Sequence, residues 1–185
     1  MARDLLPLLV IAFVVLIARS SLADHYVVPT GSMEPTVAVG DRVLVNKLAY
    51  GVRVPLTTAW LSGPAMPARG DVVVLESPED GEVLLKRVAA VGGDRVAVCG
   101  DRVYLGDHQA ADPKSLPSPY PRRSFRRGSG CFGPITIPPG KVFLLGDNRP
   151  NSHDSRGFGT VAQQAVLGRA VAVFQRHGSL VWRGL

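Results

Sequence analysis

Apolar residues run along this chain in short stretches that are separated by turn-forming residues. Most of the stretches are rich in valine and leucine, and runs of this length and composition favour β-strands. Gly, Pro and Asp lie between them, as at Gly92-Gly93-Asp94, where tight turns are expected. The pattern predicts strands over residues 43–45, 72–75, 83–85, 88–91, 96–98 and 142–145.

Two segments depart from this pattern. Residues 161–173 are the best helix candidate, although residues 166–173 fit a closing strand equally well. Residues 100–139 hold four prolines between positions 113 and 121, so this stretch is predicted to be an excursion or small inserted subdomain. The chain is therefore predicted to be mainly β, with a sandwich or barrel-like domain over residues 24–185.

The N-terminus carries a longer apolar run, over residues 5–18. This run is shorter than the roughly 20 residues that span a bilayer, but Arg19 can snorkel and Leu22 and Ala23 can extend the helix. Residues 1–23 are therefore predicted to be a membrane anchor, and the positive tip with Arg3 favours an N-terminus in the cytosol. A cleavable secretory signal that ends at Ser21-Leu22-Ala23 is the competing interpretation.

Composition narrows the class of protein. Hydrophobic residues make up 46% and charged residues 19% of the 185 residues, which excludes a disordered chain. The net charge of +6 suits an anionic surface, although the arginine run over residues 122–127 also fits a solvated loop. Cys99 and Cys131 lack metal or redox spacing; outside the cytosol they could form one disulfide, and two free buried thiols are the alternative.

Three segments could carry chemistry. Ser32 lies among small and turn-forming residues, which can expose a nucleophile beside backbone N–H groups. Lys86 lies in an apolar strand-like segment, where burial would lower its pKa and supply a neutral amine. The loop over residues 146–157 is dense in polar groups directly after a predicted strand. The histidines are poor candidates for the base, since His153 is adjacent to Asp154 and adjacent side chains usually point apart.

Taken in order, these motifs resemble the type I signal peptidase family over most of the chain. The matching segments are Ser32-Met33-Glu34-Pro35-Thr36 with Gly40-Asp41, Arg69-Gly70-Asp71-Val72-Val73, Lys86-Arg87-Val88 with Gly92-Gly93-Asp94, and Gly146-Asp147-Asn148-Arg149 through Ser155-Arg156. Two places depart from the family pattern: Pro150 replaces the acidic residue that is common there, and Gly92-Gly93-Asp94 has a glycine where a proline is usual. Both are turn-like, so we expect changed loop stiffness and intact chemistry.

The resemblance implies a role for each matching residue. Ser32 would be the nucleophile and Lys86 the general base. The Ser32 N–H and the Thr30 hydroxyl would form the oxyanion hole. Ser152 would orient Lys86 by a hydrogen bond. Asp154 would pair with Arg156, and Arg87 with Asp147.

The resemblance also implies the substrate and the location. The substrate would be the extended end of a preprotein signal peptide, with small residues at positions −1 and −3, bound by strand addition. We expect groove walls from Val28, Pro29, Met33 and Leu85. An apolar face resting on the lipid bilayer would hold Trp60, Leu61, Met66, Val54 and Leu56, with core packing as the alternative. The protein would be a monomeric, single-pass protein of the bacterial inner membrane with its catalytic domain outside the cytoplasm. No nucleic acid, cofactor or metal is expected.

Two other classes of protein compete with this hypothesis. A self-cleaving repressor-type Ser/Lys peptidase would need a DNA-binding helical domain in place of the apolar N-terminus, and none is visible in the sequence. An exported, non-enzymatic β domain could use the arginine run on anionic lipid or polymer. Cleavage of an Ala-x-Ala peptide that depends on Ser32 would separate these classes from a signal peptidase.

Overall fold

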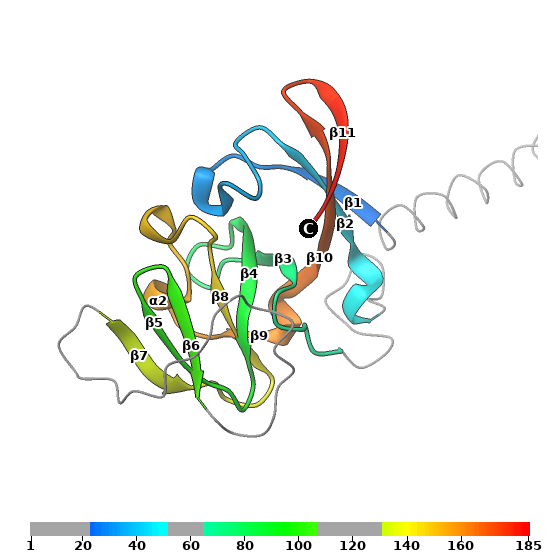
Figure 1. Cartoon of the computed structure of the whole chain (residues 1–185). Helices are drawn as coiled ribbons and strands as arrows, with labels where there is room; N and C mark the ends of the chain where they lie inside the picture. Colours follow the sequence, from blue (N-terminus) through cyan, green and yellow to red (C-terminus); the bar gives the residue numbers. More distant parts are fainter. Residues whose placement is uncertain (1–22, 52–64, 107–130) are drawn as a thin grey trace, which may run out of the picture.

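The computed structural model of the chain describes residues 23–51, 65–106 and 131–185. These residues form two antiparallel β-sheets (Figure 1). The strands of the large sheet are β1 (Ala23–Val27), β2 (Arg42–Asn46), β3 (Val72–Glu76), β4 (Val83–Val91), β8 (Lys141–Leu145), β9 (Val161–Ala162), β10 (Val166–Arg176) and β11 (Ser179–Gly184). The small sheet consists of β5 (Arg95–Cys99), β6 (Arg102–Gly106) and β7 (Cys131–Thr136).

The large sheet has the strand order β1-β2-β10-β3-β4-β8-β9, and β11 pairs with β10. Strand β4 joins its two halves, because residues 83–87 pair with β3 and residues 87–91 pair with β8. The small sheet has the order β6-β5-β7. Short helical turns connect the strands: η1 (Gly31–Met33), η2 (Lys47–Tyr50), η3 (Arg149–Asn151), α2 (Ser155–Phe158) and η4 (Gln163–Ala165).

All six predicted strand segments lie within observed strands, and two of them merge into β4. The helix expected over residues 161–173 is wrong. The alternative strand is correct, but β10 lies inside the sheet with β2 on one edge and β3 and β11 on the other. Alternation decides this: residues 166, 168, 170 and 172 are buried and the residues between them are more exposed, which is the period of a strand.

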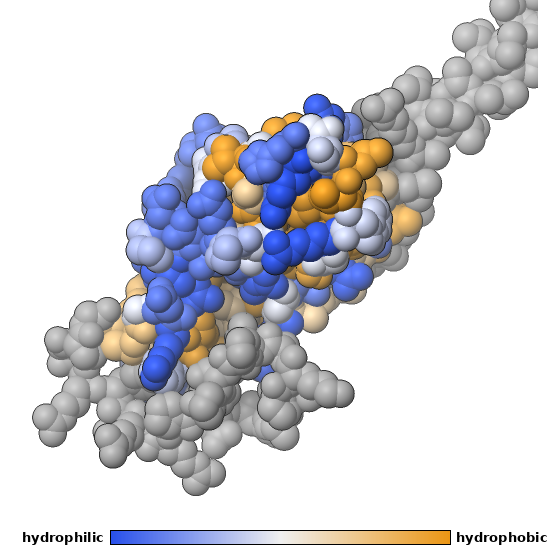
Figure 2. All heavy atoms as spheres, turned by 45° about the horizontal axis from the view of Figure 1, so that its top comes forward, coloured by the Kyte–Doolittle hydropathy of each residue, from blue (hydrophilic) through white to orange (hydrophobic). Residues whose placement is uncertain are grey.

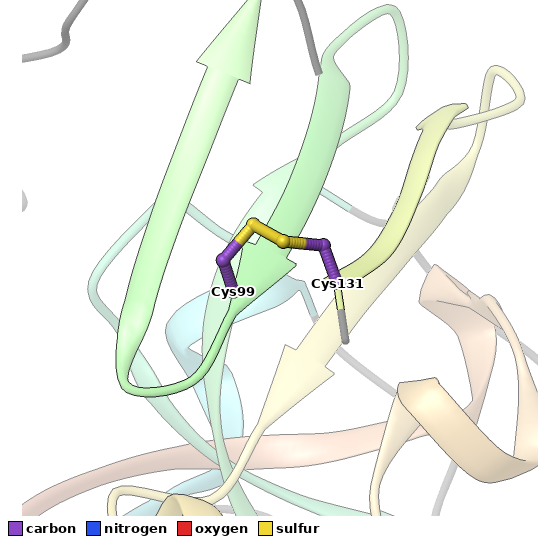
Figure 3. Close-up of a disulfide and its surroundings, with 2 residues drawn as sticks. All are labelled: Cys99 and Cys131. Carbon is purple, nitrogen blue, oxygen red and sulfur yellow. A yellow bond between two sulfur atoms is a disulfide. The ribbon is translucent and has the colours of Figure 1, made fainter. Parts of the chain in front are cut away.

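Residues 100–139 are only in part the excursion that we expected. Strands β6 and β7 fall in this stretch and pair on either side of β5. Cys99 and Cys131 are joined by a disulfide across the β5–β7 pair (Figure 3). The two cysteines face each other in the strand register, so the bond fastens the end of β5 to the start of β7.

The core consists of valine-rich clusters on the two sides of the large sheet and a third cluster beneath the small sheet. On one side of the large sheet, Met33 and Val37 of the segment after β1 pack against buried residues of β2, β3 and β10. Phe143 and Leu145 of β8 pack against the small sheet and so join the two sheets. Each Å² of apolar surface buried in these clusters contributes about 25 cal/mol, and this burial holds the strands in register.

The predicted anchor, residues 1–23, lies almost wholly outside the described residues. Ala23, which we assigned to its end, is the first residue of β1 and pairs with Asn46. Within the described ranges no helix is long and apolar enough to cross a membrane.

Candidate active site

The segment that carries Ser32 is a short turn, η1, that follows β1. Met33 and Val37 hold this turn to the core, since both side chains are fully buried and the Val37 N–H donates to the Met33 carbonyl at 2.9 Å. Ser32 stays half-buried beside them. We expected Met33 in the wall of a substrate groove; this expectation is wrong, because its side chain points into the core cluster.

Lys86 lies opposite Ser32, on β4. Its Nζ is 2.8 Å from Ser32 Oγ, and the residue is only 3% exposed. Burial lowers the pKa of Lys86, and the nearby Asp154 carboxylate opposes this shift. A buried amine within hydrogen-bond distance of a hydroxyl can accept its proton once the amine is neutral.

The neighbouring residue, Arg87, has a different partner. Its Nε and Nη2 donate to the two carboxylate oxygens of Asp147 at 2.8 and 2.7 Å, and Thr36 donates to the same carboxylate at 2.6 Å. Burial alone would raise the pKa of Asp147, but these hydrogen bonds hold it below its usual value. The pair therefore ties β4 to the loop that follows β8 and to the segment after Ser32.

Asp154 and Arg156 form the second pair in that loop. Arg156 Nε and Nη2 donate to Asp154 at 2.8 and 2.9 Å, and the Gly146 N–H donates to the same carboxylate at 3.1 Å. The Asp154 side chain is fully buried. Although burial would raise the pKa of Asp154, the hydrogen bonds lower it, so the carboxylate stays ionised near enough to Lys86 to raise the pKa of the lysine.

Ser152 differs from our expectation. Its Oγ is buried and, among the described residues, has no hydrogen-bond partner of ordinary geometry, so the predicted bond to Lys86 is absent. The hydroxyl that contacts Lys86 Nζ is that of Ser32. Ser152 packs against Gly146, where an added Cβ would collide with the serine side chain.

Thr30 lies on the other side of the nucleophile. Its Oγ1 is 3.5 Å from Ser32 Oγ, a long contact that leaves the hydroxyl free to turn towards another acceptor. Thr30 and Ser32 both line a groove of about 230 Å³.

The groove runs between the segment around the end of β1 and the first half of β4. It is mostly apolar, and Lys86 and Ser32 lie within its lining. Val28, Pro29 and Leu85, which we predicted as wall residues, all line it. The other lining residues are Tyr26, Val27, Thr30, Val43, Val74, Glu82, Val83 and Leu84.

Sequence reasoning missed two residues of the site, Thr36 and Asn148. Asn148 donates from Nδ2 to the Gly31 carbonyl and from its backbone N–H to the Ser32 carbonyl, each at 3.0 Å. Thr36 and Asn148 both lie within the motifs that resemble the signal peptidase family, so the resemblance could have indicated them. Local pattern alone gives no sign that residues more than 100 positions apart meet.

The chain matches a sequence model of the family described as "Signal peptidase, peptidase S26" over residues 2–175. It is 33% identical to signal peptidase I of Pseudomonas fluorescens and 32% identical to that of Pseudomonas aeruginosa, and each alignment covers 89% of this chain and 69% of the relative. The chain therefore belongs to the peptidase S26 family of signal peptidases. It is a serine-type hydrolase that cleaves the signal peptides of preproteins.

A solved structure of a signal peptidase I from Enterococcus faecalis V583 also aligns with the chain. The TM-score is 0.41 at 28% identity, with 57% of this chain and 97% of that chain covered.

Proposed function

We propose that this signal peptidase works with a Ser32 nucleophile and a Lys86 general base. The observation that carries the proposal is the 2.8 Å contact between Lys86 Nζ and Ser32 Oγ, with Lys86 buried. Neutral Lys86 takes the serine proton as Ser32 attacks the scissile carbonyl, and it later protonates the leaving amine. The Ser32 N–H and the Thr30 hydroxyl stabilise the oxyanion.

The two ion pairs, Arg87 with Asp147 and Arg156 with Asp154, hold the segments next to the dyad. Asp147 anchors Arg87, the residue next to Lys86, and Asp154 holds the loop through Gly146 and Arg156. These contacts fix the backbone on both sides of the dyad, which lowers the reorganisation that the reaction requires.

The substrate is proposed to bind as an added strand. Residues 83–86 of β4 pair with β3, whereas pairing with β8 begins only at Arg87, so among the described strands the groove side of 83–86 carries no partner. An extended peptide placed there would find backbone donors and acceptors along one side of the groove. Val28 and Leu85 line the groove together with Ser32, and we propose that they form the apolar pockets for small residues at positions −1 and −3.

The location is proposed from charge and hydropathy. Residues 1–23 would anchor a monomer by a single span in the bacterial inner membrane, with the catalytic domain on the extracytoplasmic side; the disulfide agrees with an oxidising compartment. Of the predicted lipid-facing residues, Met66 is 38% exposed, whereas Val54, Leu56, Trp60 and Leu61 lie outside the described residues. Leu180 and Trp182 of β11 are highly exposed and fit the same lipid surface.

Figure 2, turned so that the top of Figure 1 comes forward, shows hydrophobic surface at the end of the molecule from which β10 and β11 project. Val27 and Val83, which line the groove, are also about half exposed, at 55% and 47%. An apolar surface that adjoins the groove would let the enzyme meet a signal peptide at the bilayer.

The test is cleavage of a preprotein, in detergent or liposomes, by Ser32→Ala and Lys86→Ala. Each substitution should abolish cleavage without changing the unfolding midpoint by more than the matched variants Ser179→Ala and Lys141→Ala, whose residues are exposed. Undiminished cleavage by either dyad variant would refute the proposed mechanism.

A further inference from the structure

The loop after β8 lies in direct contact with the turn that carries the nucleophile. Gly146 is the residue that allows this: a Cβ there would stand 2.5 Å from the Ser32 carbonyl oxygen. The close approach brings Asn148 into contact with two successive carbonyls of the turn, those of Gly31 and Ser32.

The contact to Gly31 bears on the oxyanion hole. The Gly31 carbonyl and the Ser32 N–H belong to one peptide unit, and in a planar trans peptide these two groups point in opposite directions. Asn148 Nδ2 donates to the Gly31 carbonyl at 3.0 Å, and the Glu34 N–H donates to it at 3.2 Å. Fixing the carbonyl end of the unit therefore fixes the direction of the Ser32 N–H.

We propose that Asn148 is a positioning residue that orients the Gly31–Ser32 peptide, so that the Ser32 N–H points at the developing oxyanion. The inference rests on the proposed Ser32 mechanism. An oxyanion donor works because it is already oriented before the reaction. The hydrogen bond at the carbonyl also polarises the amide and makes its N–H a better donor.

Asn148 is itself held rigidly enough for this task. Its neighbour Asp147 receives hydrogen bonds from Arg87 and Thr36. The Asn148 carbonyl accepts from the Asn151 N–H at 3.0 Å. Arg87 follows Lys86 on β4, so one chain of contacts aligns the oxyanion donor with the strand that carries the base.

The experiment compares Asn148→Ala with Asn151→Ala, a matched change at an exposed residue of the same loop. Two ligands are used: an Ala-x-Ala peptide boronic acid and the same peptide with a C-terminal amide. Ser32 Oγ adds to boron while its proton passes to Lys86, and an oxygen on the tetrahedral boron takes the place of the oxyanion. The amide has no electrophile and reports ground-state binding.

For Asn148→Ala we expect kcat and boronate affinity to fall together by about tenfold or more, a smaller effect than the ~100–1,000-fold loss of a direct oxyanion donor. KM and amide affinity should stay unchanged, because the groove is intact. Under the proposed mechanism activity rises with pH as Lys86 loses its proton, and the midpoint of this rise should stay unchanged, because the contact of Lys86 with Ser32 is not altered. Asn151→Ala should match the wild type throughout.

Equal weakening of both ligands, or of neither, would overturn the inference, as would a shifted pH midpoint. If Asn148→Ala does not fold, Asn148→Ser is measured in the same way, since its shorter side chain keeps polarity but cannot reach Gly31. Failure of the proposed mechanism looks different: the wild type would then bind boronate and amide alike, and Ser32→Ala would still cleave.

Discussion

Asp154 offers the sharpest test of how the site is held together. Its fully buried carboxylate accepts from Arg156 Nε and Nη2, from the Arg156 N–H and from the Gly146 N–H. Asp154→Ala removes all of these acceptors at once. The Gly146 N–H is then left inside the protein without its partner, and the Arg156 guanidinium loses its counter-charge.

Breaking a buried ion pair by removing one partner costs about 3–5 kcal/mol. Arg156 is 26% exposed and can turn partly towards water, so we expect the lower end, about 3 kcal/mol. In a chain of this size each kcal/mol lowers the melting temperature by about 2–4 °C. Asp154→Ala should therefore melt roughly 6–12 °C below the wild type.

The same substitution should move the pH profile in a direction that a general loss of stability would not produce. The Asp154 carboxylate raises the pKa of Lys86 against the effect of burial. Without it, the pKa of Lys86 falls further, and the remaining activity should rise at lower pH than in the wild type.

The assay is thermal and urea denaturation at pH 7, for the melting temperature and the free energy of unfolding, together with kcat/KM for a fluorogenic Ala-x-Ala peptide across neutral and alkaline pH. Asp80→Ala is the matched control, since Asp80 is an exposed residue of the β3–β4 turn, and it should leave both measurements nearly unchanged. A loss of stability no larger than that of Asp80→Ala would refute the reasoning. So would a rise of kcat/KM that is displaced to higher pH than in the wild type.

Three further predictions concern Lys86, Gly146 and the disulfide. Because burial lowers the pKa of Lys86, wild-type kcat/KM should rise with pH through a midpoint below 10.5, the ordinary value for lysine; a flat profile would exclude Lys86 as the base. Gly146→Ala should cost about 1–3 kcal/mol through overpacking against Ser152 and the Ser32 carbonyl, whereas Gly184→Ala, which meets nothing, should be neutral in denaturation. Joint Cys99→Ser and Cys131→Ser should lower stability by about 2–5 kcal/mol, and an unchanged urea midpoint would contradict this.

The strands of the core were predictable from the sequence because burial on a sheet selects short β-branched runs. The strands that the pattern missed are those in which burial is weaker. Strand β1 is exposed at three of five positions and β11 at every position, so burial explains neither strand, although β11 contains the apolar run Leu180-Val181-Trp182. Strand β7 contains Pro134, which argues against a strand until one sees that β7 lies at the edge of its sheet.

The site was predictable only as separate segments. Ser32 and Lys86 are 54 residues apart, and no local pattern states that they meet; the resemblance to a family joined them. What the resemblance could not supply was the distribution of hydrogen bonds. The hydroxyl of Ser152 was expected on Lys86 but is buried without a hydrogen-bond partner in the described part of the chain, whereas Ser32 Oγ lies 2.8 Å from Lys86 Nζ.

Adjacent residues on β4 explain why the nucleophile and the base can be aligned so closely. Lys86 is directed to Ser32, and Arg87 is directed to Asp147, as alternation along a strand requires. Asp147 is followed in the chain by Asn148, whose backbone N–H donates to the Ser32 carbonyl. A movement of β4 that displaced the base would therefore also pull on the turn that carries the nucleophile, so the two are held in register by the same strand. The coupling predicts that Arg87→Met lowers kcat although Arg87 touches no reacting atom, and that Arg87→Lys, which cannot form the bidentate pair, restores only part of the loss.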